Sequence, residues 1–400
     1  MAAEIETGAS QAAAGPAALP DVTIVANDIG PVGGMERQLT DLIAGLRVLG
    51  HHVTVIARTC DLPDGVDVDF HRVVGPGRPF VLAHTWFLFA GSLVTRRRRR
   101  GILQVNGAVV FNRADIAAVH YCHQVGPANA SRSSPLFEAH VKLASVLKRR
   151  SEGPTYRLND PAVFVGVSEG VADEVREHHP RFADRVEAIH NGVDTSAFAP
   201  GVHAEAARAE RVRLEIPDDA LTLAFVGSEW GRKGLEPVIR ALGEAPDWTL
   251  LVVGSGDREH YGRLARTLGV ESRVRFLGVR SDVAVIYGAA DAFVLPSSYE
   301  TFSIVTFEAA ASGLPVLATP VSGVRELVRD GENGYLIRPD AGVIGDRLNL
   351  LAGDPELRAR LGAAARASAL GFDSQRMVRR YHELYERLAA EGRVRGAARR

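Results

Sequence analysis

Two glutamates eight residues apart, Glu300 and Glu308, are the residues of this chain whose type and spacing most clearly suggest chemistry. A carboxylate is a good bidentate acceptor for the neighbouring hydroxyl groups of a sugar. On a helix with about 3.6 residues per turn, the two positions differ in direction by roughly 80°, so both side chains can face one ligand. Two surface glutamates on an amphipathic helix are the simpler interpretation, and the flanking segments decide between the two.

A strand-to-helix junction contains both glutamates. The apolar run Ala292–Leu295 predicts a buried strand, and the alanine-rich segment that follows predicts a helix ending at Gly313. We expect its first turn over residues 301–304, where free N–H groups and the helix dipole attract phosphate. These residues include Phe302, Ser303 and Ile304. Phosphate at the helix start and ribose hydroxyls at Glu308 together describe a nucleotide, at the strand end where open α/β sheets bind ligands.

A basic turn follows another predicted strand, Leu221–Val226. The turn combines small residues with Arg232 and Lys233. Small residues let the backbone approach a ligand, and adjacent Arg and Lys side chains supply charge for a diphosphate. A solvated basic turn is the alternative, but the position at a strand end favours diphosphate binding. The later segment Gly254–Gly256 lacks the third glycine of a dinucleotide fingerprint, so we interpret it as a turn that lines the nucleotide pocket.

Two segments of the N-terminal half hold further candidates. Gly33 and Gly34 follow the first predicted strand and open a helix, where glycine permits positive φ and a close backbone approach. His120, Cys122 and His123 follow an apolar run. Strand alternation would place His123 opposite the other two, which argues against a metal site made of these three. We expect no metal site elsewhere in the chain.

Apolar runs alternate with helical segments along the whole chain, which predicts α/β domains with doubly wound parallel sheets. A chain of 400 residues is longer than the chains that usually fold around a single hydrophobic core, so two domains are expected. We predict a disordered tail over residues 1–20, domains over 21–198 and 199–372, and a terminal helical segment over 373–400. The predicted strands are Val22–Ala26, Val53–Ile56, Val163–Val167, Leu221–Val226, Leu250–Val253, Ala292–Leu295 and Pro315–Ala318.

The segment from Glu300 to Glu308 resembles the paired-glutamate motif of retaining glycosyltransferases with the GT-B fold, in particular glycosyltransferase family 4 (glycosyl transferases group 1). The similarity extends along most of the chain and is weakest on the acceptor side. Members usually carry glycine where Ser303 stands. The resemblance implies two Rossmann-like domains that face a central cleft, with a last helix that crosses back onto the N-terminal domain.

For the C-terminal half, the resemblance implies a site for a nucleotide-sugar donor. Arg232 and Lys233 would hold the diphosphate, Glu308 the ribose, and Glu300 would contact the transferred sugar. The resemblance also implies that configuration is retained. A UDP- or GDP-sugar is the expected donor, with no cofactor and no metal ion.

For the N-terminal half, the resemblance implies that His123 lies near the donor sugar, with His120 as the alternative. The loop with Gly33 and Gly34 would reach across the cleft toward phosphate and acceptor. The acceptor itself stays open between a lipid-linked compound, a saccharide and a small metabolite. A nucleotide-sugar epimerase and a non-catalytic nucleotide-sugar-binding protein with the same fold are the alternatives to a transferase.

Charge and cysteine content argue against other classes. A net charge of −1 gives no reason to expect nucleic acid as a partner, although the arginine run at residues 96–100 keeps a nucleic-acid binder as a third alternative. Cys60 and Cys122 lack the C-x-x-C spacing and suggest no disulfide framework, which fits a cytoplasmic protein.

The arginine run has two interpretations. It follows the apolar stretch Phe80–Thr95, which is too short to span a bilayer and which we expect to be a buried helix, so the arginines would complement its C-terminus. Together with Lys148–Arg150 they would otherwise form a basic patch for peripheral contact with an anionic membrane.

Overall fold

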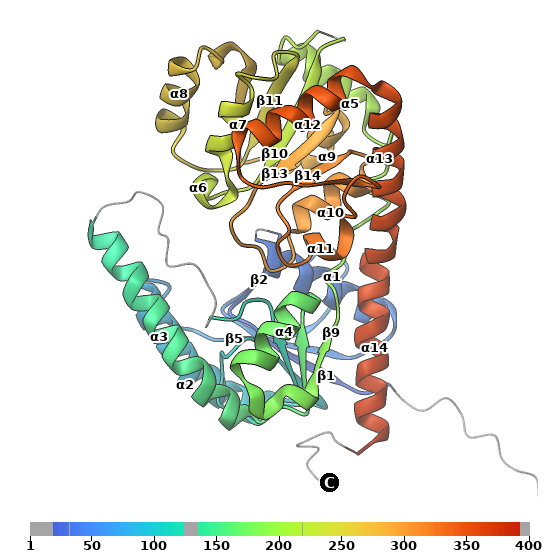
Figure 1. Ribbon diagram of the computed structural model, residues 1–400. Helices are drawn as coiled ribbons and strands as arrows, with labels where there is room; N and C mark the ends of the chain where they lie inside the picture. The colour runs from blue at the N-terminus through green and yellow to red at the C-terminus, as the bar shows by residue number, and fades with distance from the viewer. Residues whose placement is uncertain (1–18, 32, 124–134, 218, 393–400) are drawn as a thin grey trace, which may run out of the picture.

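The computed structural model describes residues 19–31, 33–123, 135–217 and 219–392. Within these ranges the chain forms two α/β halves, one above the other in Figure 1. Each half is built on a twisted parallel sheet with helices packed against it. The prediction of two doubly wound parallel sheets is therefore confirmed.

The N-terminal sheet has seven parallel strands among the described residues. Their spatial order is β5 (Asp69–Arg72), β3 (Val53–Ala57), β1 (Val22–Val25), β6 (Ile102–Asn106), β7 (Ile116–Val119), β8 (Val163–Gly166) and β9 (Val186–Ala188). Ile24 of β1 packs in the cluster that contains Leu42 of a helix on one face, and Val25 packs in the cluster that contains Phe87 of a helix on the other face. Burial on both faces explains why these strands are almost continuously apolar.

The C-terminal sheet has six parallel strands in the described part of the chain. Their order is β12 (Val274–Gly278), β11 (Trp248–Val253), β10 (Leu221–Val226), β13 (Ala292–Leu295), β14 (Val316–Ala318) and β15 (Gly334–Leu336). The direction of winding reverses between β10 and β13, which are neighbours in the sheet. In a doubly wound sheet, ligands bind outside the carboxyl ends of the strands at such a reversal. The loops after β10 and β13 are therefore the first place to look for a site.

The helices of the N-terminal half are α1 (Gly34–Val48), α2 (Phe80–Arg98), α3 (Pro135–Asn159) and α4 (Glu169–His178). Those that follow are α5 (Ala204–Arg213), α6 (Trp230–Lys233), α7 (Leu235–Ala241), α8 (Arg258–Thr267), α9 (Val283–Gly288), α10 (Ile304–Ala311), α11 (Val324–Leu327), α12 (Ala341–Gly353), α13 (Pro355–Ala369) and α14 (Ser374–Ala390). A short two-stranded sheet pairs β2 (Asp28–Ile29) with β4 (Thr59–Cys60).

The last helix, α14, belongs to the N-terminal half although it ends the described chain. Figure 1 shows it running down the side of the molecule from α13 in the upper half to the lower half. Tyr381 and Leu384 lie in the same buried cluster as Leu42 of α1. Gly45 of α1 lets the two helices approach, because a Cβ there would lie 2.5 Å from a Val378 methyl carbon. The chain therefore passes twice between the halves.

The interpretation of residues 80–95 as a buried helix is wrong. Leu82, Trp86, Phe89 and Leu93 of α2 are between 49% and 65% exposed. These four residues follow helical spacing and form a second apolar stripe, separate from the face on which Phe87 is buried. Among the described helices, none combines the length and apolar content needed to cross a membrane.

Candidate active site between the two halves

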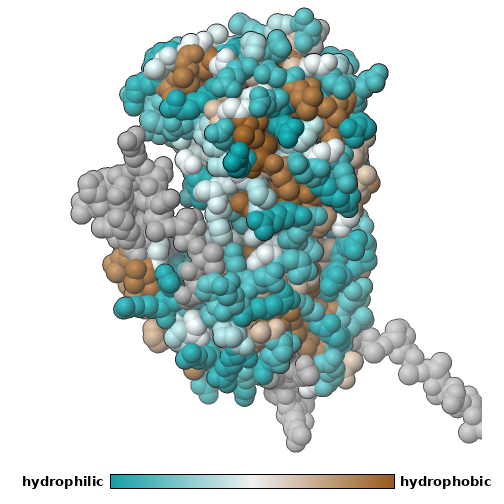
Figure 2. All heavy atoms as spheres, viewed as in Figure 1, coloured by the Kyte–Doolittle hydropathy of each residue, from teal (hydrophilic) through white to brown (hydrophobic). Residues whose placement is uncertain are grey.

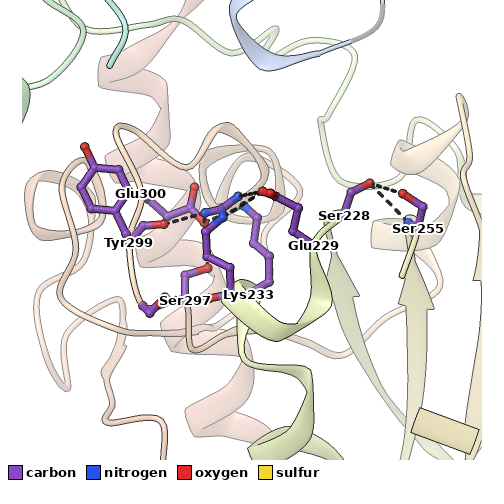
Figure 3. Close-up of polar contacts among 9 residues, drawn as sticks. Ser228, Glu229, Lys233, Ser255, Ser297, Tyr299 and Glu300 are labelled. Atoms are coloured by element: carbon purple, nitrogen blue, oxygen red, sulfur yellow. Dashed lines mark hydrogen bonds and ion pairs between the residues drawn. The ribbon is translucent and has the colours of Figure 1, made fainter. Parts of the chain in front are cut away.

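Glu300 lies at the centre of a buried polar cluster after β13 (Figure 3). Its Oε1 accepts hydrogen bonds from Lys233 Nζ at 2.6 Å and Ser297 Oγ at 2.7 Å, and it lies 3.4 Å from Arg232 Nη1. Glu300 and Lys233 are each only 8% exposed. In the described part of the chain, Oε2 of Glu300 makes no hydrogen bond. The carboxylate is thus fixed through one oxygen, and its second oxygen can accept from a ligand.

Arg232 is held in place by two further contacts. Its Nη1 donates to the Tyr299 carbonyl oxygen at 2.7 Å, and its Nε donates to Glu229 Oε2 at 2.9 Å. The loops that carry these residues pack directly on each other. Gly234, with φ of 80°, allows this, because a Cβ there would lie 2.4 Å from the Pro296 carbonyl oxygen. Two cations from the end of β10 and one carboxylate from the end of β13 therefore form one rigid unit.

A rim of small residues borders this unit. Gly254 lies against Gly227, since a Cβ on Gly254 would be 2.2 Å from the Gly227 carbonyl oxygen. The hydroxyl of Ser255 donates to Ser228 Oγ at 2.9 Å, and both side chains are exposed (Figure 3). Exposed hydroxyls and a closely approaching backbone beside two cations make a surface suited to an anionic ligand.

The helix after Glu300 begins later than predicted. It starts at Ile304, so Thr301 to Ser303 lie in the preceding loop and the expected first turn over 301–304 is wrong. The reason is Ser303, whose φ of 67° is left-handed and cannot be part of a right-handed helix. This conformation also explains physically why glycine would suit the position. Phe302 does not reach a ligand with its side chain, because its ring is buried and stacks on Phe307 at 4.1 Å.

Glu308 lies within α10 but meets the other half of the molecule. Its Oε1 accepts from Arg37 Nη2 at 2.6 Å, and its Oε2 accepts from the Tyr287 hydroxyl at 3.2 Å. The side chain of Glu308 is buried, whereas Arg37 of α1 is 41% exposed. Sequence reasoning missed Arg37. The one signal was its position directly after the Gly33–Gly34 loop.

The glycine loop lies near the start of α10. A Cβ on Gly34 would be 3.5 Å from Ile304 Cδ1, so this loop approaches the N-terminal end of α10. Gly33 has φ of 99° and precedes α1, and a Cβ there would meet the Glu36 carboxylate at 2.1 Å. The positive φ gives Gly33 a structural reason, whereas at Gly34 a Cβ would make only an ordinary contact with Ile304 in the other half.

His123 lies on the N-terminal side and reaches the Glu300 cluster only through aromatic rings. Its ring centroid is 4.9 Å from that of Tyr121, which lies 5.6 Å from the Tyr299 ring next to Glu300. Burial, together with the charge of Lys148, lowers the pKa of His123 to about 4. The imidazole is therefore neutral at pH 7 and can exchange hydrogen bonds but carries no charge.

The strand-alternation argument for this segment does not apply. Strand β7 ends at Val119, so His120, Cys122 and His123 follow the strand in a loop. Burial lowers the pKa of His120 to about 4 as well, so it is also neutral at pH 7.

Further contacts close the two halves around this region. Ser168 Oγ donates to the Thr301 carbonyl oxygen at 2.7 Å, and the Tyr299 hydroxyl donates to Glu174 Oε2 at 3.3 Å. The Glu169 N–H donates to Glu326 Oε1 at 3.1 Å. The predicted residues therefore fall into three groups along the boundary: the Glu300 cluster, the Glu308–Arg37 pair with the glycine loop, and His123.

Comparison with known proteins identifies the class. The family model described as Glycosyltransferase Family 4 matches residues 32–197, and the model described as Glycosyl transferases group 1 matches residues 207–368. The chain belongs to this family of glycosyltransferases, and the resemblance drawn from its sequence is confirmed.

Individual relatives support the same family assignment. An uncharacterized glycosyltransferase of Methanocaldococcus jannaschii is 30% identical over an alignment of 331 residues, covering 77% of this chain and 82% of that protein. A D-inositol 3-phosphate glycosyltransferase of Streptomyces coelicolor is 30% identical over an alignment of 394 residues, covering 86% of this chain and 85% of that protein.

Solved structures share the fold. WaaG, a glycosyltransferase involved in lipopolysaccharide biosynthesis, superposes with a TM-score of 0.73 at 20% identity, over 91% of this chain and 99% of that chain. Anabaena HepE, solved in complex with UDP-glucose, superposes with a TM-score of 0.68 at 21% identity, over 92% of this chain and 100% of that chain. The architecture is GT-B, as the sequence resemblance implied.

Proposed function

We propose that this glycosyltransferase takes its sugar from a nucleotide-diphosphate donor, with retention of configuration and without a metal ion at the diphosphate. The observation that carries the proposal is the convergence of Lys233 and Arg232 on Glu300 at the winding reversal of the C-terminal sheet. Two fixed cations and the start of α10 can stabilise the charge that develops on a leaving diphosphate.

Donor binding would exchange partners within this cluster. The diphosphate would take hydrogen bonds from Lys233 and Arg232, which now point at Glu300. Glu300 would then offer its Oε2 to a hydroxyl of the transferred sugar and lie near the cationic sugar centre. Because the Lys233 ammonium and the Glu300 carboxylate hold each other in place before the donor arrives, the two cations are already positioned beside the diphosphate site when it binds.

The ribose would bind at Glu308. The Tyr287 hydroxyl and Arg37 each contact one oxygen of this buried carboxylate, so the ribose hydroxyls would take the place of the partly exposed Arg37 guanidinium. His123 would exchange hydrogen bonds with the donor sugar as a neutral ring. The complex of Anabaena HepE with UDP-glucose supports a uridine donor among the nucleotides to test.

The acceptor belongs to the N-terminal half. The Streptomyces coelicolor relative is a D-inositol 3-phosphate glycosyltransferase, and WaaG is involved in lipopolysaccharide biosynthesis. We therefore include phosphorylated polyols and lipid-linked saccharides in the acceptor class to be screened.

We propose in addition that the N-terminal half contacts an anionic lipid surface. The exposed apolar stripe of α2 lies beside α3, where Leu143 and Val146 are also about half exposed. Figure 2 shows hydrophobic atoms at the left edge of the molecule, where α3 lies in Figure 1. The exposed arginines next to this surface are Arg96, Arg97, Arg98, Arg100 and Arg150. Apolar side chains flanked by arginines are the combination that binds anionic membranes peripherally.

The test of the donor site is thermal stabilisation of the pure protein by UDP, GDP, ADP, dTDP and NAD in the presence of a chelator. We expect one nucleoside diphosphate to raise the melting temperature, because a ligand that binds only the folded state stabilises it. A shift with NAD alone, or none with any diphosphate, would contradict the proposed donor. An NMR assay with that donor then separates acceptor-dependent transfer with retained configuration from acceptor-independent epimerisation and from binding without turnover.

A further inference from the structure

Three side chains that commonly bind metals meet in the N-terminal half, and none of them belongs to the Glu300 cluster. Cys122 follows β7, Glu152 lies in α3 and His179 follows α4. The thiol sulfur, a carboxylate oxygen and an imidazole nitrogen all lie within 4.8 Å of one another, and the three residues are buried. Among the described residues, no other group of this kind gathers three such ligand atoms. The residues are far apart in the sequence, so the fold alone creates the cluster.

Polar atoms at the centre of this cluster lack partners. Within the described part of the chain, Glu152 Oε2 and His179 Nε2 have no hydrogen-bond partner, and both atoms are buried. They lie 3.7 Å apart, which is too long for a hydrogen bond. The nearby Tyr156 hydroxyl is likewise buried without a partner among these residues. Native proteins rarely leave three neighbouring buried polar atoms unsatisfied, so something is expected to bind between them.

We propose that Cys122, Glu152 and His179 bind a Zn²⁺ ion. Zinc forms bonds of about 2.0–2.2 Å to imidazole nitrogen and carboxylate oxygen and about 2.3 Å to sulfur. The 3.7 Å gap between Glu152 and His179 is shorter than the sum of two such bonds, so one zinc ion reaches both atoms. In a tetrahedral zinc site the sulfur and the nitrogen lie about 3.6 Å apart, so side-chain rotations of about 1 Å or less bring ligand atoms that are within 4.8 Å of one another onto one ion.

The ligand set itself favours zinc. A thiolate with an imidazole is soft and suits zinc, whereas magnesium and calcium prefer oxygen ligands alone. Three protein ligands leave a fourth position for water, and the Tyr156 hydroxyl is buried nearby. The thiol must lose its proton to bind, so uptake of the metal releases a proton.

The metal would position the acceptor side of the site. It would join the segment after β7 to α3 and to the residue that follows α4. The second oxygen of Glu152, Oε1, accepts the backbone N–H of His123 at 3.2 Å. One carboxylate would thus bind the metal and also hold the backbone next to Tyr121, whose ring faces Tyr299. This site is separate from Arg232, Lys233 and Glu300 and takes no part in binding the diphosphate.

The first experiment measures zinc in the full chain. Protein from zinc-supplemented medium is dialysed against metal-free buffer and its metal content determined by mass spectrometry, with about one zinc per chain expected. After chelation, Co²⁺ uptake should give a thiolate-to-cobalt absorption band. Cys122→Ser should lose both signals, and the matched control Cys60→Ser should keep them, because Cys60 lies in β4 outside the cluster. Wild-type protein with well under one zinc per chain, or a cobalt band that persists in Cys122→Ser, would overturn the proposal.

A conservative variant covers the case in which Cys122→Ser does not fold. Glu152→Gln keeps an oxygen that can accept the His123 N–H but removes the charge from the metal site. We expect its zinc affinity to fall by at least about tenfold while the stabilisation by nucleoside diphosphate stays unchanged. An unchanged zinc affinity would contradict the assignment of Glu152 as a ligand.

Discussion

The two sides of the candidate site hold their functional residues in different ways. On the proposed donor side, Lys233 and Glu300 are in direct contact at 2.6 Å, and both belong to segments after neighbouring strands. On the proposed acceptor side, His123 reaches the boundary through ring contacts of about 5 Å and lies beside Lys148 and Glu152 of α3. The proposed donor side is a fixed arrangement of charges, whereas the proposed acceptor side meets the boundary with aromatic rings and a neutral histidine.

This difference suggests how the two substrates are distinguished. A diphosphate is the same in every nucleotide sugar, so a rigid pair of cations serves any donor of this kind. Acceptors vary in shape and polarity, and contacts made by rings and neutral histidines can change with little electrostatic cost. We therefore expect substitutions on the donor side to affect binding steeply and those on the acceptor side to act more gradually.

The largest effect is expected from Arg232→Ala combined with Lys233→Ala. Hydrogen bonds to charged groups contribute about 1.5–3 kcal/mol each, so loss of two should weaken nucleoside diphosphate binding by roughly 10²- to 10⁴-fold. Isothermal titration with nucleoside diphosphate and monophosphate measures this, and the preference for the diphosphate should disappear. The exposed Arg240→Ala of α7 is the matched control, since Arg240 pairs only with Glu236 among the described residues. A preserved diphosphate preference in the double variant would contradict the proposed role.

Glu308→Gln should have the next largest effect. The amide keeps the shape of the side chain but loses the charge that accepts from ribose and pairs with Arg37. We expect binding to weaken by about 10- to 100-fold, since a charged hydrogen bond is worth about 1.5–3 kcal/mol. The discriminating measurement compares the nucleotide with its 2′-deoxy analogue. Wild type should prefer the ribonucleotide and the variant should not, and an equal preference in both proteins would place the ribose elsewhere.

On the acceptor side, Trp86→Ser with Phe89→Ser should reduce binding to anionic vesicles. Both side chains are exposed on α2 and lie outside the buried core, so their removal takes apolar area from the membrane contact. Trp86→Ser also loses the hydrogen bond from Trp86 Nε1 to the Val74 carbonyl oxygen. We expect vesicle partitioning in a sedimentation assay to fall by at least about tenfold, since burying each side chain is worth about 1.5–3 kcal/mol. The donor-induced thermal shift should stay the same. If the variant still binds vesicles and its binding does not depend on anionic lipid, the exposed stripe of α2 is not the membrane contact.

His123 offers a pH test of the acceptor side. Its pKa is about 4 in the folded protein, below the ordinary value of 6.5. As pH falls from about 6.5 to about 4, the unfolded chain takes up a proton here and the folded chain does not, so the free energy of unfolding falls. Urea unfolding at pH 7 and pH 5 should show a smaller loss for His123→Gln than for wild type. Equal losses would mean that His123 is not held neutral by the fold.

The smallest effect is expected from Ser303→Gly on the donor side. Glycine removes a left-handed strain of about 1–2 kcal/mol, but it makes the unfolded chain more flexible by about 0.5–1 kcal/mol and loses the 2.8 Å hydrogen bond between Ser303 Oγ and Thr306 Oγ1. These terms nearly cancel, so the melting temperature should change by only a few degrees in either direction. A large loss of stability would show that the hydroxyl contact matters more than the strain.

The sequence predicts features that are formed by neighbouring residues better than contacts between residues that are far apart in the chain. Most central strands and the Glu300 motif are local, so apolar runs and short spacings predict them. The edge strands β5, β9 and β12 were missed because their residues are partly exposed and do not form apolar runs. The central strand β6 and the edge strand β15 were also missed, although both are largely buried, because Gln104 and Asn106 interrupt the apolar run of β6 and β15 has only three residues. Ser303 was placed in a helix because its left-handed conformation leaves no trace in composition. Contacts between distant residues, such as Arg37 with Glu308, depend on how the halves meet and have no local signal.

The return of α14 to the N-terminal half sets the order in which the protein can mature during synthesis. Tyr381, Leu384 and Leu388 complete the buried cluster around α1, yet they are made after every strand of both sheets. A ribosome-bound chain therefore exposes the part of α1 that α14 covers, around Gly45, until translation is nearly finished, while the C-terminal sheet can already close. A fragment that ends before residue 373 would carry the same exposed face permanently, so the N-terminal half is expected to need the end of the chain to become soluble.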